Sequence, residues 1–297
     1  MEYGQNASPQ AVRIMNSMQP DPESMNIIPE VLNREPFQVL RCYQGRCFFS
    51  EHDLIKEEPL LIRVEENPYS VVMRTPGEEI FHAAGFCLAE GIVDDASDFI
   101  SIGYCEDMDP NVVDVRLQPG RREKVAPLLQ RRSFLSQTSC GICGKEMVEE
   151  MCQSLSPIED HTQIRLTDAI QIIENLYENQ KLRKKTRGSH GVMLLDSHLQ
   201  PLSIAEDVGR HNALDKAIGR LLMDKALAKA RIGVLSSRIS YEMVQKAARA
   251  QLPILLSISR PTALAVHLGK SLNMTLACTA RESELIIFCK QDRIIRE

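Results

Sequence analysis

The chain has 297 residues, of which 43% are hydrophobic and 25% are charged, and its formal net charge is −5. This composition is ordinary for a soluble globular protein of one large domain or two smaller ones, and the acidic balance excludes a general attraction to nucleic acid. The polar start is no signal peptide and no apolar run is long enough to cross a bilayer, so we expect a cytoplasmic protein with no membrane partner. The cysteine count of nine is odd and does not indicate a disulfide framework, so we expect a reduced protein.

Residues 1–36 are expected to be a disordered tail, because prolines and polar residues alternate there without a hydrophobic period. Residues 37–132 are expected to form a strand-rich α+β subdomain. After several short strands, a helix is predicted over residues 78–91, with Gly91 as its cap, and two more strands over residues 100–104 and 112–117. Four cysteines are expected to be core or half-buried residues rather than ligands: Cys42, Cys47, Cys87 and Cys105.

The most informative motif is Cys140-Gly141-Ile142-Cys143-Gly144, in a segment (residues 133–160) that we interpret as a mobile loop followed by a helix. Helix-forming sequence begins directly after this pair, at Lys145. The positive end of the helix dipole and the Lys145 charge both favour thiolate, which is the reactive form of cysteine. The motif therefore indicates attack on sulfur, or carriage of sulfur, by Cys140 and Cys143.

Three other interpretations of this pair are open at this point. A structural zinc site needs four ligands, and only Cys152 and His161, at an awkward spacing, could complete one. A thioredoxin-like dithiol belongs near the start of a βαβ unit, whereas this pair lies mid-chain. A loop pair without chemistry is disfavoured by the flanking glycines and polar neighbours. We expect no structural metal.

Residues 161–297 alternate strands and helices, which predicts a three-layer α/β/α domain. Thr167 can cap its first helix. The elements that follow are expected as strand, strand, helix, strand, helix, strand, helix, strand and strand over residues 190–196, 201–205, 212–225, 232–235, 241–251, 254–258, 263–272, 275–278 and 285–288. The first two of these strands are expected to pair with each other.

Ligands of such sheets bind at the carboxyl edge of the strands, beside helix N-termini. Residues 206–212, 236–238 and 257–262 fit that description, and Pro261 is expected to open the last helix. Hydroxyl groups, arginines and free helix N–H groups meeting at one edge suit a phosphate or diphosphate, although Ser and Thr before helices are usually plain N-caps. The candidate ligand contacts in these segments are Asp207, Arg210, His211, Asn212, Ser237, Arg238, Ser259 and Thr262.

The histidines of this half differ in what they indicate. His211 lies at a helix start and could bind a ligand, or it could orient Asp207 or Asp215; both readings stay open. His190 opens a predicted strand and could face the same edge. The chain has no Walker loop, no HExxH and no HxE before the cysteine pair, so nucleotide hydrolysis and zinc hydrolysis lack their usual residues.

Four motifs make the chain recognisable: SCGICGK, EDVGRHNALDKAIG, LSSRISYEMVQKA and SRPTALAV. Together with MRTPGEEIFHAAGFCLAEGI, they closely resemble the FdhD/NarQ family, the formate dehydrogenase accessory sulfurtransferases, from about residue 37 to residue 290. The resemblance implies a carrier that moves sulfur from a cysteine desulfurase to the molybdenum bis(molybdopterin guanine dinucleotide) cofactor of formate dehydrogenase. It also implies a homodimer and a C-terminal domain similar to the cytidine deaminase-like fold, without the zinc signature of that fold.

The resemblance assigns further roles residue by residue. It implies that Cys140 bears a persulfide, that Cys143 is its partner, and that His190 is a retained cofactor contact. It adds a cofactor-contacting loop made of Thr279, Ala280, Arg281, Glu282, Ser283 and Glu284. The chain departs from the family pattern in two places. Thr279 replaces a usual aromatic residue that could stack on guanine, and the segment from Thr186 to His190 replaces a TGG-x-H pattern, with Arg187 at a glycine position.

We therefore interpret the chain as a sulfurtransferase in which Cys140 takes persulfide sulfur, while the cofactor lies across the strand edge with its phosphates near Ser237 and Arg238. The main alternative is a non-catalytic chaperone that binds the molybdenum cofactor and does not need its cysteines. A zinc-stabilised interaction module would instead carry stoichiometric metal. The acidic balance and the lack of interleaved aromatic residues argue against a nucleic-acid reader.

Overall fold

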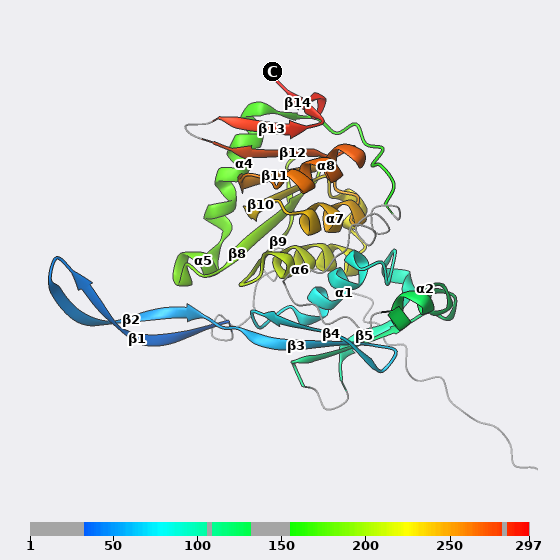
Figure 1. Ribbon diagram of the computed structural model, residues 1–297, viewed down its shortest axis with the longest axis horizontal. Coiled ribbons are helices and arrows are strands. Elements are labelled where there is room, and N and C mark those ends of the chain that lie inside the picture. The colour runs from blue at the N-terminus through cyan, green and yellow to red at the C-terminus, as the bar shows by residue number, and fades with distance from the viewer. Residues whose placement is uncertain (1–32, 106–108, 132–154, 281–283, 297) are drawn as a thin grey trace, which may run out of the picture.

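The computed structural model describes residues 33–105, 109–131, 155–280 and 284–296. Figure 1 shows a six-stranded sheet with helices on its faces, a four-stranded sheet below it, and a two-stranded hairpin that projects to the left. The mixed α/β class is the predicted one, while the cytidine deaminase-like fold and the domain boundaries stay predictions. Among the described residues, no helix combines the length and the apolar character that crossing a membrane requires.

The N-terminal half is built mainly of antiparallel strands. Its strands are β1 (Arg34–Tyr43), β2 (Arg46–Ile55), β3 (Glu58–Val64), β4 (Asn67–Arg74), β5 (Phe99–Tyr104) and β6 (Val112–Leu117). Among the residues that the structure describes, β1 pairs only with β2, and the others form a sheet in the order β4-β3-β6-β5. Leu60, Ile62 and Val64 are buried and alternate with more exposed residues, as expected of a strand with one face on the core.

Two helices accompany these strands. The predicted helix is confirmed as α1 (Glu79–Ala89), and Gly91 follows its last turn with φ +74°, where glycine commonly ends helices. The second helix, α2 (Pro119–Arg131), was not predicted from its basic, polar sequence, although Pro119 is well suited to a first helical position.

The six-stranded sheet has the order β13-β12-β11-β10-β8-β9. Its strands are β8 (His190–Leu195), β9 (Pro201–Asp207), β10 (Ile232–Arg238), β11 (Ile254–Ser259), β12 (Thr275–Thr279) and β13 (Leu285–Cys289). β10, β11 and β12 run parallel, and β8 is antiparallel to both β9 and β10. All six strands were predicted, and the expected pairing of β8 with β9 is confirmed.

Helices cover both faces of this sheet. They are α4 (Leu166–Asn179), α5 (Lys181–Thr186), α6 (Arg210–Met223), α7 (Tyr241–Arg249) and α8 (Ala263–Ser271). α4 packs on one face through a separate core cluster, while α6, α7 and α8 pack on the other. The short α5 and the parallel pair of β7 (Ile164–Arg165) and β14 (Ile294–Ile295) were not predicted.

One predicted helix start is wrong, and one predicted role at a helix start is wrong. α4 begins at Leu166 with Arg165 as its N-cap residue, so Thr167 already lies inside the helix. α8 begins at Ala263, because the Thr262 hydroxyl caps it by accepting a hydrogen bond from the Ala265 N–H, and Pro261 lies outside the helix. The predicted start of α8 at Ala263 is therefore confirmed, and only the role given to Pro261 is wrong.

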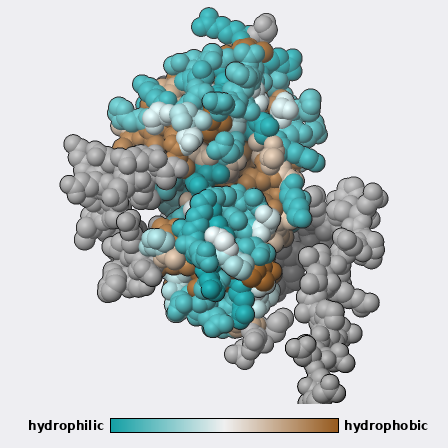
Figure 2. All heavy atoms as spheres, turned by 90° about the vertical axis from the view of Figure 1, so that its right-hand side faces the viewer, coloured by the Kyte–Doolittle hydropathy of each residue, from teal (hydrophilic) through white to brown (hydrophobic). Residues whose placement is uncertain are grey.

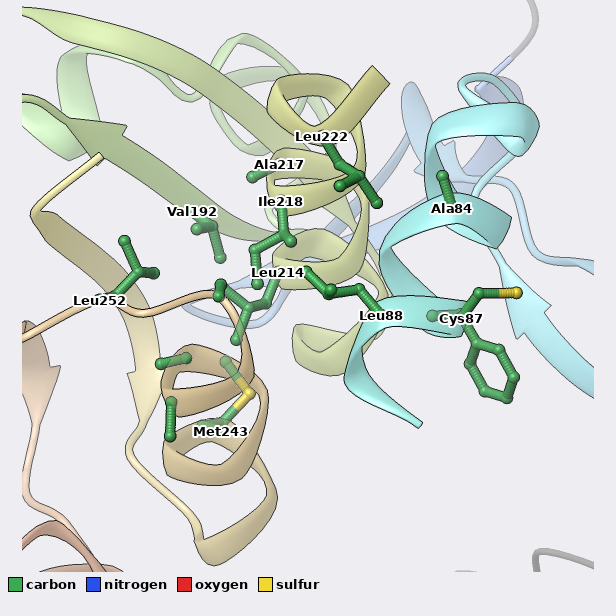
Figure 3. Close-up of a cluster of buried hydrophobic side chains, with 14 of the residues drawn as sticks. Ala84, Cys87, Leu88, Val192, Leu214, Ala217, Ile218, Leu222, Met243 and Leu252 are labelled. Atoms are coloured by element: carbon green, nitrogen blue, oxygen red, sulfur yellow. The ribbon is translucent and has the colours of Figure 1, made fainter. Parts of the chain in front are cut away.

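Helices α1 and α6 join the two halves of the chain by very close packing. A Cβ atom at Gly85 would lie 1.9 Å from the Asp215 carbonyl oxygen, and one at Gly219 would lie 1.8 Å from the Phe81 carbonyl oxygen. Figure 3 shows side chains of α1, α6 and α7 meeting around this contact, among them Leu88, Leu214 and Met243. One continuous hydrophobic core therefore runs from the four-stranded sheet to the six-stranded sheet.

The side chains on the right-hand side of the molecule are drawn in Figure 2. Hydrophilic residues cover most of that face, and hydrophobic residues form a band across its middle.

The cysteines of the N-terminal half follow the prediction only in part. Cys87 and Cys105 are buried and free, as expected. Cys42 and Cys47 are exposed and form a disulfide, so their predicted burial and the expectation of reduced cysteines are wrong for this pair. The cause is the hairpin: Gln44 and Gly45 both have positive φ, and this tight turn places the two cysteines directly opposite each other.

Candidate functional site

The candidate site lies at the carboxyl edge of the six-stranded sheet, where β8 begins and β10 ends. Because β8 runs against β9 and β10, His190 at its start lies opposite Asp207 at the end of β9. The His190 Nδ1 atom is 3.5 Å from the Ser236 Oγ atom, and that hydroxyl accepts a hydrogen bond from the Gly191 N–H at 2.8 Å. This edge therefore carries an imidazole and a hydroxyl side by side.

The first residues of α6 bring a cation and a second imidazole to the same edge. The Arg210 Nε and His211 Nε2 atoms are buried and have no hydrogen-bond partner among the described residues. The nearest acidic group to the His211 ring is Glu242 on α7, whose Oε2 atom lies 3.9 Å from Nε2. Buried polar atoms are normally hydrogen-bonded, and leaving them unpaired is unfavourable. The pair is therefore suited to receive polar groups of a ligand.

Both imidazoles are neutral at pH 7. Burial lowers the pKa of His190, and the charges of Arg210 and Arg183 lower it further. Burial also lowers the pKa of His211, to about 4, with added effects of Arg210 and Lys246. The positive charge at this edge therefore comes from arginine, while each neutral imidazole can donate one hydrogen bond and accept another.

Asp207 and Asn212 hold the site in place and do not face a ligand. Asp207 is completely buried, receives a hydrogen bond from the Thr75 N–H at 3.0 Å, and pairs with the Lys216 ammonium at 2.7 Å. The Asn212 amide donates to Asp207 and to the Met73 carbonyl oxygen. The prediction of ligand contacts is therefore corrected for these two residues, because their polar atoms are taken up inside the protein.

The other predicted contacts lie along the same edge with different degrees of access. β10 continues through Ser237 and Arg238, although both were expected to follow the strand. Ser237 is buried, and its hydroxyl donates a hydrogen bond to the Arg238 carbonyl oxygen. The Arg238 side chain is exposed. Ser259 ends β11 and is half-buried. Thr262 acts as the N-cap of α8, so its hydroxyl is already an acceptor within the helix.

The predicted loop before β13 is described only at its ends. Thr279 ends β12, and the Ala280 N–H donates to the Glu284 carbonyl oxygen at 2.8 Å. Ala280 and Glu284 are exposed. Arg281, Glu282, Ser283, Cys140 and Cys143 lie outside the described residues, as does the predicted CxxC loop.

Sequence reasoning missed three residues of this edge. Ser236 lies inside a predicted segment, but the prediction names its neighbour Ser237; strand alternation could separate the two. Glu242 lies within a predicted helix, and no local pattern marks it as a site residue. Gln180 is fully buried, and its amide has no hydrogen-bond partner in the part of the chain that the structure describes. A Cβ atom at Gly191 would lie 2.6 Å from its Nε2 atom. Nothing in the sequence pattern marks Gln180, because only the fold brings it beneath β8.

Two further features bear on what this part of the chain can bind. In the residues that the structure describes, no group of three or more His, Cys, Asp or Glu side chains is placed to hold a metal ion. A cavity of about 170 Å³ lies beside β9, and its lining includes Thr75, Lys181, Glu206 and Lys216. The lining of this cavity does not include His190, Arg210 or His211. The cavity is therefore separate from the candidate site at the strand edge.

Comparison with known proteins places the chain among relatives of similar length. The FdhD/NarQ family model matches residues 55–295. A relative from Streptomyces coelicolor named sulfur carrier protein FdhD is 33% identical over 267 residues, covering 86% of this chain and 94% of the relative. A protein of the same name from Xanthomonas euvesicatoria pv. vesicatoria is 32% identical over 275 residues, covering 92% and 95%.

A solved structure shares the fold. The crystal structure of a protein described as a formate dehydrogenase accessory protein, from Desulfotalea psychrophila, matches with a TM-score of 0.70 at 22% identity, covering 89% of this chain and 100% of that one. The family match spans most of the chain, and relatives above 30% identity cover more than four fifths of it. This chain belongs to the FdhD/NarQ family.

Proposed function

We propose that this chain is a sulfur carrier for formate dehydrogenase, which takes persulfide sulfur from a cysteine desulfurase and passes it to molybdenum bis(molybdopterin guanine dinucleotide). Membership of a family whose relatives are named sulfur carriers carries the proposal. The Cys140–Cys143 pair supplies the sulfur chemistry, and the strand edge supplies unpartnered polar atoms for the substrate. The protein acts in the cytoplasm as a homodimer.

The first step is transfer between cysteines. The Cys140 thiolate attacks the outer sulfur of the desulfurase persulfide. A new S–S bond forms on Cys140, the S–S bond of the donor breaks, and the donor cysteine leaves as a thiolate. The sulfane sulfur is transferred from the donor cysteine to Cys140 without any net oxidation or reduction.

The second step must supply electrons, because sulfane sulfur becomes sulfide when it reaches a metal. The Cys143 thiolate attacks the inner sulfur of the Cys140 persulfide, and the outer sulfur leaves as sulfide toward the molybdenum substrate. The two electrons come from the cysteine pair, which ends as a Cys140–Cys143 disulfide. A dithiol reductant then restores both thiols.

The strand edge suits the dinucleotide substrate by its charge and its hydrogen-bonding groups. Arg210 offers a positive charge for a diphosphate, and the exposed Arg238 offers a second. The neutral imidazoles of His190 and His211 can donate to phosphate or ribose oxygens without adding charge. Thr279 has no ring for stacking on guanine, so the base depends on other contacts.

Intact-mass measurement after incubation with a cysteine desulfurase and cysteine tests the carrier role. We expect one added sulfur, removable by reductant, on the wild-type protein and on Cys143→Ala, and none on Cys140→Ala. The double variant Cys42→Ser with Cys47→Ser is the matched control and should load sulfur like the wild type. Loading that persists in Cys140→Ala contradicts the assigned role. A protein that binds the cofactor but never gains sulfur is a chaperone instead.

A further inference from the structure

The β1–β2 hairpin, residues 34–55, is an arm that carries an unusual share of exposed apolar surface. Figure 1 shows it leaving the body of the protein at the left. Six of the fourteen large hydrophobic side chains that are exposed among the described residues lie on this arm: Phe37, Leu40, Tyr43, Phe48, Phe49 and Leu54. Tyr43 and Phe49 are 71% and 69% exposed. Contiguous exposed apolar surface of this kind marks an interaction site.

The strand register places most of these side chains on one face of the arm. Residues directly opposite each other share a face, so the pairs Tyr43–Arg46, Arg41–Phe48 and Glu35–Leu54 lie together, and Phe37 lies with them. We call this the Tyr43 face. The other face carries Leu40, Phe49 and the disulfide. Four of the six exposed apolar residues are thus on the Tyr43 face.

A two-stranded arm of this composition is not stable by itself. In the described part of the chain, neither strand has a second partner in a sheet. Isolated two-stranded hairpins are at best marginally stable in water, and free strand edges invite pairing with another chain. Each strand has 10 residues and so spans about 33 Å. An arm of that length needs a partner along most of its face.

Charge is distributed unevenly along the arm. The tip half, residues 39–50, contains Arg41 and Arg46 and no carboxylate. The base half, residues 34–38 and 51–55, contains Glu35, Glu51 and Asp53 against one cation, Arg34, which is paired with Asp53. The tip is therefore positive and the base negative. On the Tyr43 face the charges are Arg41 and Arg46 at the tip and Glu35 at the base, whereas Glu51 and Asp53 lie on the other face.

We propose that two copies of this chain bind through their arms, which lie antiparallel about a two-fold axis with their Tyr43 faces together. In that arrangement the Arg41 and Arg46 tip of each copy meets Glu35 at the base of the other, and Glu35 is the one carboxylate that the arm carries on its Tyr43 face. A two-fold contact needs one patch that complements itself, and a patch with opposite charges at its two ends meets that condition. The inference rests on the homodimer of the proposed function and names the surface that forms it.

Charge reversal tests this interface on the full chain by sedimentation over a range of concentrations. Arg41→Glu with Arg46→Glu reverses the tip, and Glu35→Lys reverses the base. We expect each variant alone to dimerise at least about 100-fold more weakly, because like charges then meet twice. An equimolar mixture of the two should recover the wild-type dimer, because both contacts become attractive in the mixed pair. All three substitutions in one chain should recover it as well.

The control is a reversal elsewhere on the surface. Arg116→Glu with Glu66→Lys exchanges an ion pair whose side chains are 57% and 78% exposed, and should leave the dimer unchanged. A dimer that persists in both reversed variants, or a mixture that does not recover, overturns the arm interface while the homodimer stands. A wild-type protein that stays monomeric overturns both.

A second measurement separates the other occupants of the arm. Hydrogen exchange of the β1 and β2 amides should slow as protein concentration rises through the dimer range. Protection that is independent of concentration would mean that the chain covers its own arm, and protection that appears only with a different protein would mean a heterologous partner. Either result overturns the proposal. Sulfur loading of Cys140, measured by mass, reports on the proposed function independently of these outcomes.

Discussion

The α1–α6 junction and the β1–β2 arm are held together in opposite ways. At the junction, glycines allow backbone to approach backbone, and two buried ion pairs, Lys216–Asp207 and Lys246–Asp215, lie within the contact. On the arm, apolar side chains are exposed and a tight turn and a disulfide provide the local restraints. Contacts within one chain are therefore enough to stabilise the junction, whereas the arm needs a partner to bury its apolar surface.

The largest difference should appear when a buried charge loses its partner. Lys216→Met leaves the fully buried Asp207 carboxylate without its cation, and we expect the free energy of unfolding to fall by about 3–5 kcal/mol. Arg116→Ala removes an exposed ion pair and should change it by less than about 1 kcal/mol. Urea unfolding of both variants measures this. Equal effects would mean that the junction is no more than a surface contact.

Close packing at the junction should be nearly as sensitive. Gly85→Ala puts a methyl group 1.9 Å from the Asp215 carbonyl oxygen, and backbone must move to admit it. We expect a loss of about 3 kcal/mol in the free energy of unfolding. Gly120→Ala is the matched control, because a Cβ atom there meets nothing within 4 Å, and it should be neutral or slightly stabilising. A harmless Gly85→Ala would show that α1 and α6 do not pack this closely.

Protonation should weaken the junction as the pH falls. His82 is fully buried on α1, and its pKa is held well below the usual value by burial and by the charges of Lys216 and Lys246. Below pH 6.5 the His82 imidazole therefore binds a proton in the unfolded chain but stays neutral in the folded chain, so the free energy of unfolding decreases as the pH falls. The expected loss from this group is about 2 kcal/mol between pH 7 and pH 5. His82→Leu should reduce the slope of measured stability against pH over that range, and His211 and His190 should account for part of the slope that remains. An unchanged slope would contradict the assignment.

Reduction of the disulfide should destabilise the arm and leave the junction unaffected. Reduction of the Cys42–Cys47 disulfide should raise amide exchange in β1 and β2 by about 30-fold, equivalent to about 2 kcal/mol of local stability. Amides of α1 and α6 should be unaffected, because no disulfide lies between them. The double variant Cys42→Ser with Cys47→Ser should reproduce the reduced pattern without reductant. Faster exchange in both regions would mean that arm and junction unfold together.

Much of the fold could be predicted because hydrophobic periodicity is local. The six strands of the large sheet and its helices α4, α6, α7 and α8 follow from such patterns. α2 escaped prediction because its sequence is polar and contains Pro127. The Cys42–Cys47 disulfide was not predicted, because the odd number of cysteines describes the whole chain and says nothing about one pair. The local signal for this pair is the Gln44-Gly45 turn that lies between the two cysteines.

The candidate site was only partly predictable because its geometry depends on distant residues. The sequence places Arg210 and His211 at a helix start, and the structure brings them to one edge with His190. That Asp207 is internal depends on Thr75, 132 residues earlier in the chain, which no local pattern reveals. Arg187 adopts φ 56°, a conformation that favours glycine, and the resemblance to the family predicts glycine at this position.

The central claim is that sulfur carried by Cys140 is delivered to a substrate held at the His190–Arg210–His211 edge. The most direct measurement pairs two readouts on Arg210→Gln: sulfur loading of the purified protein, and formate dehydrogenase activity in cells that lack their own accessory protein. We expect loading equal to the wild type together with loss of most dehydrogenase activity, while the control Arg116→Gln keeps both. Full activity with Arg210→Gln would contradict the account, because delivery would not depend on this edge.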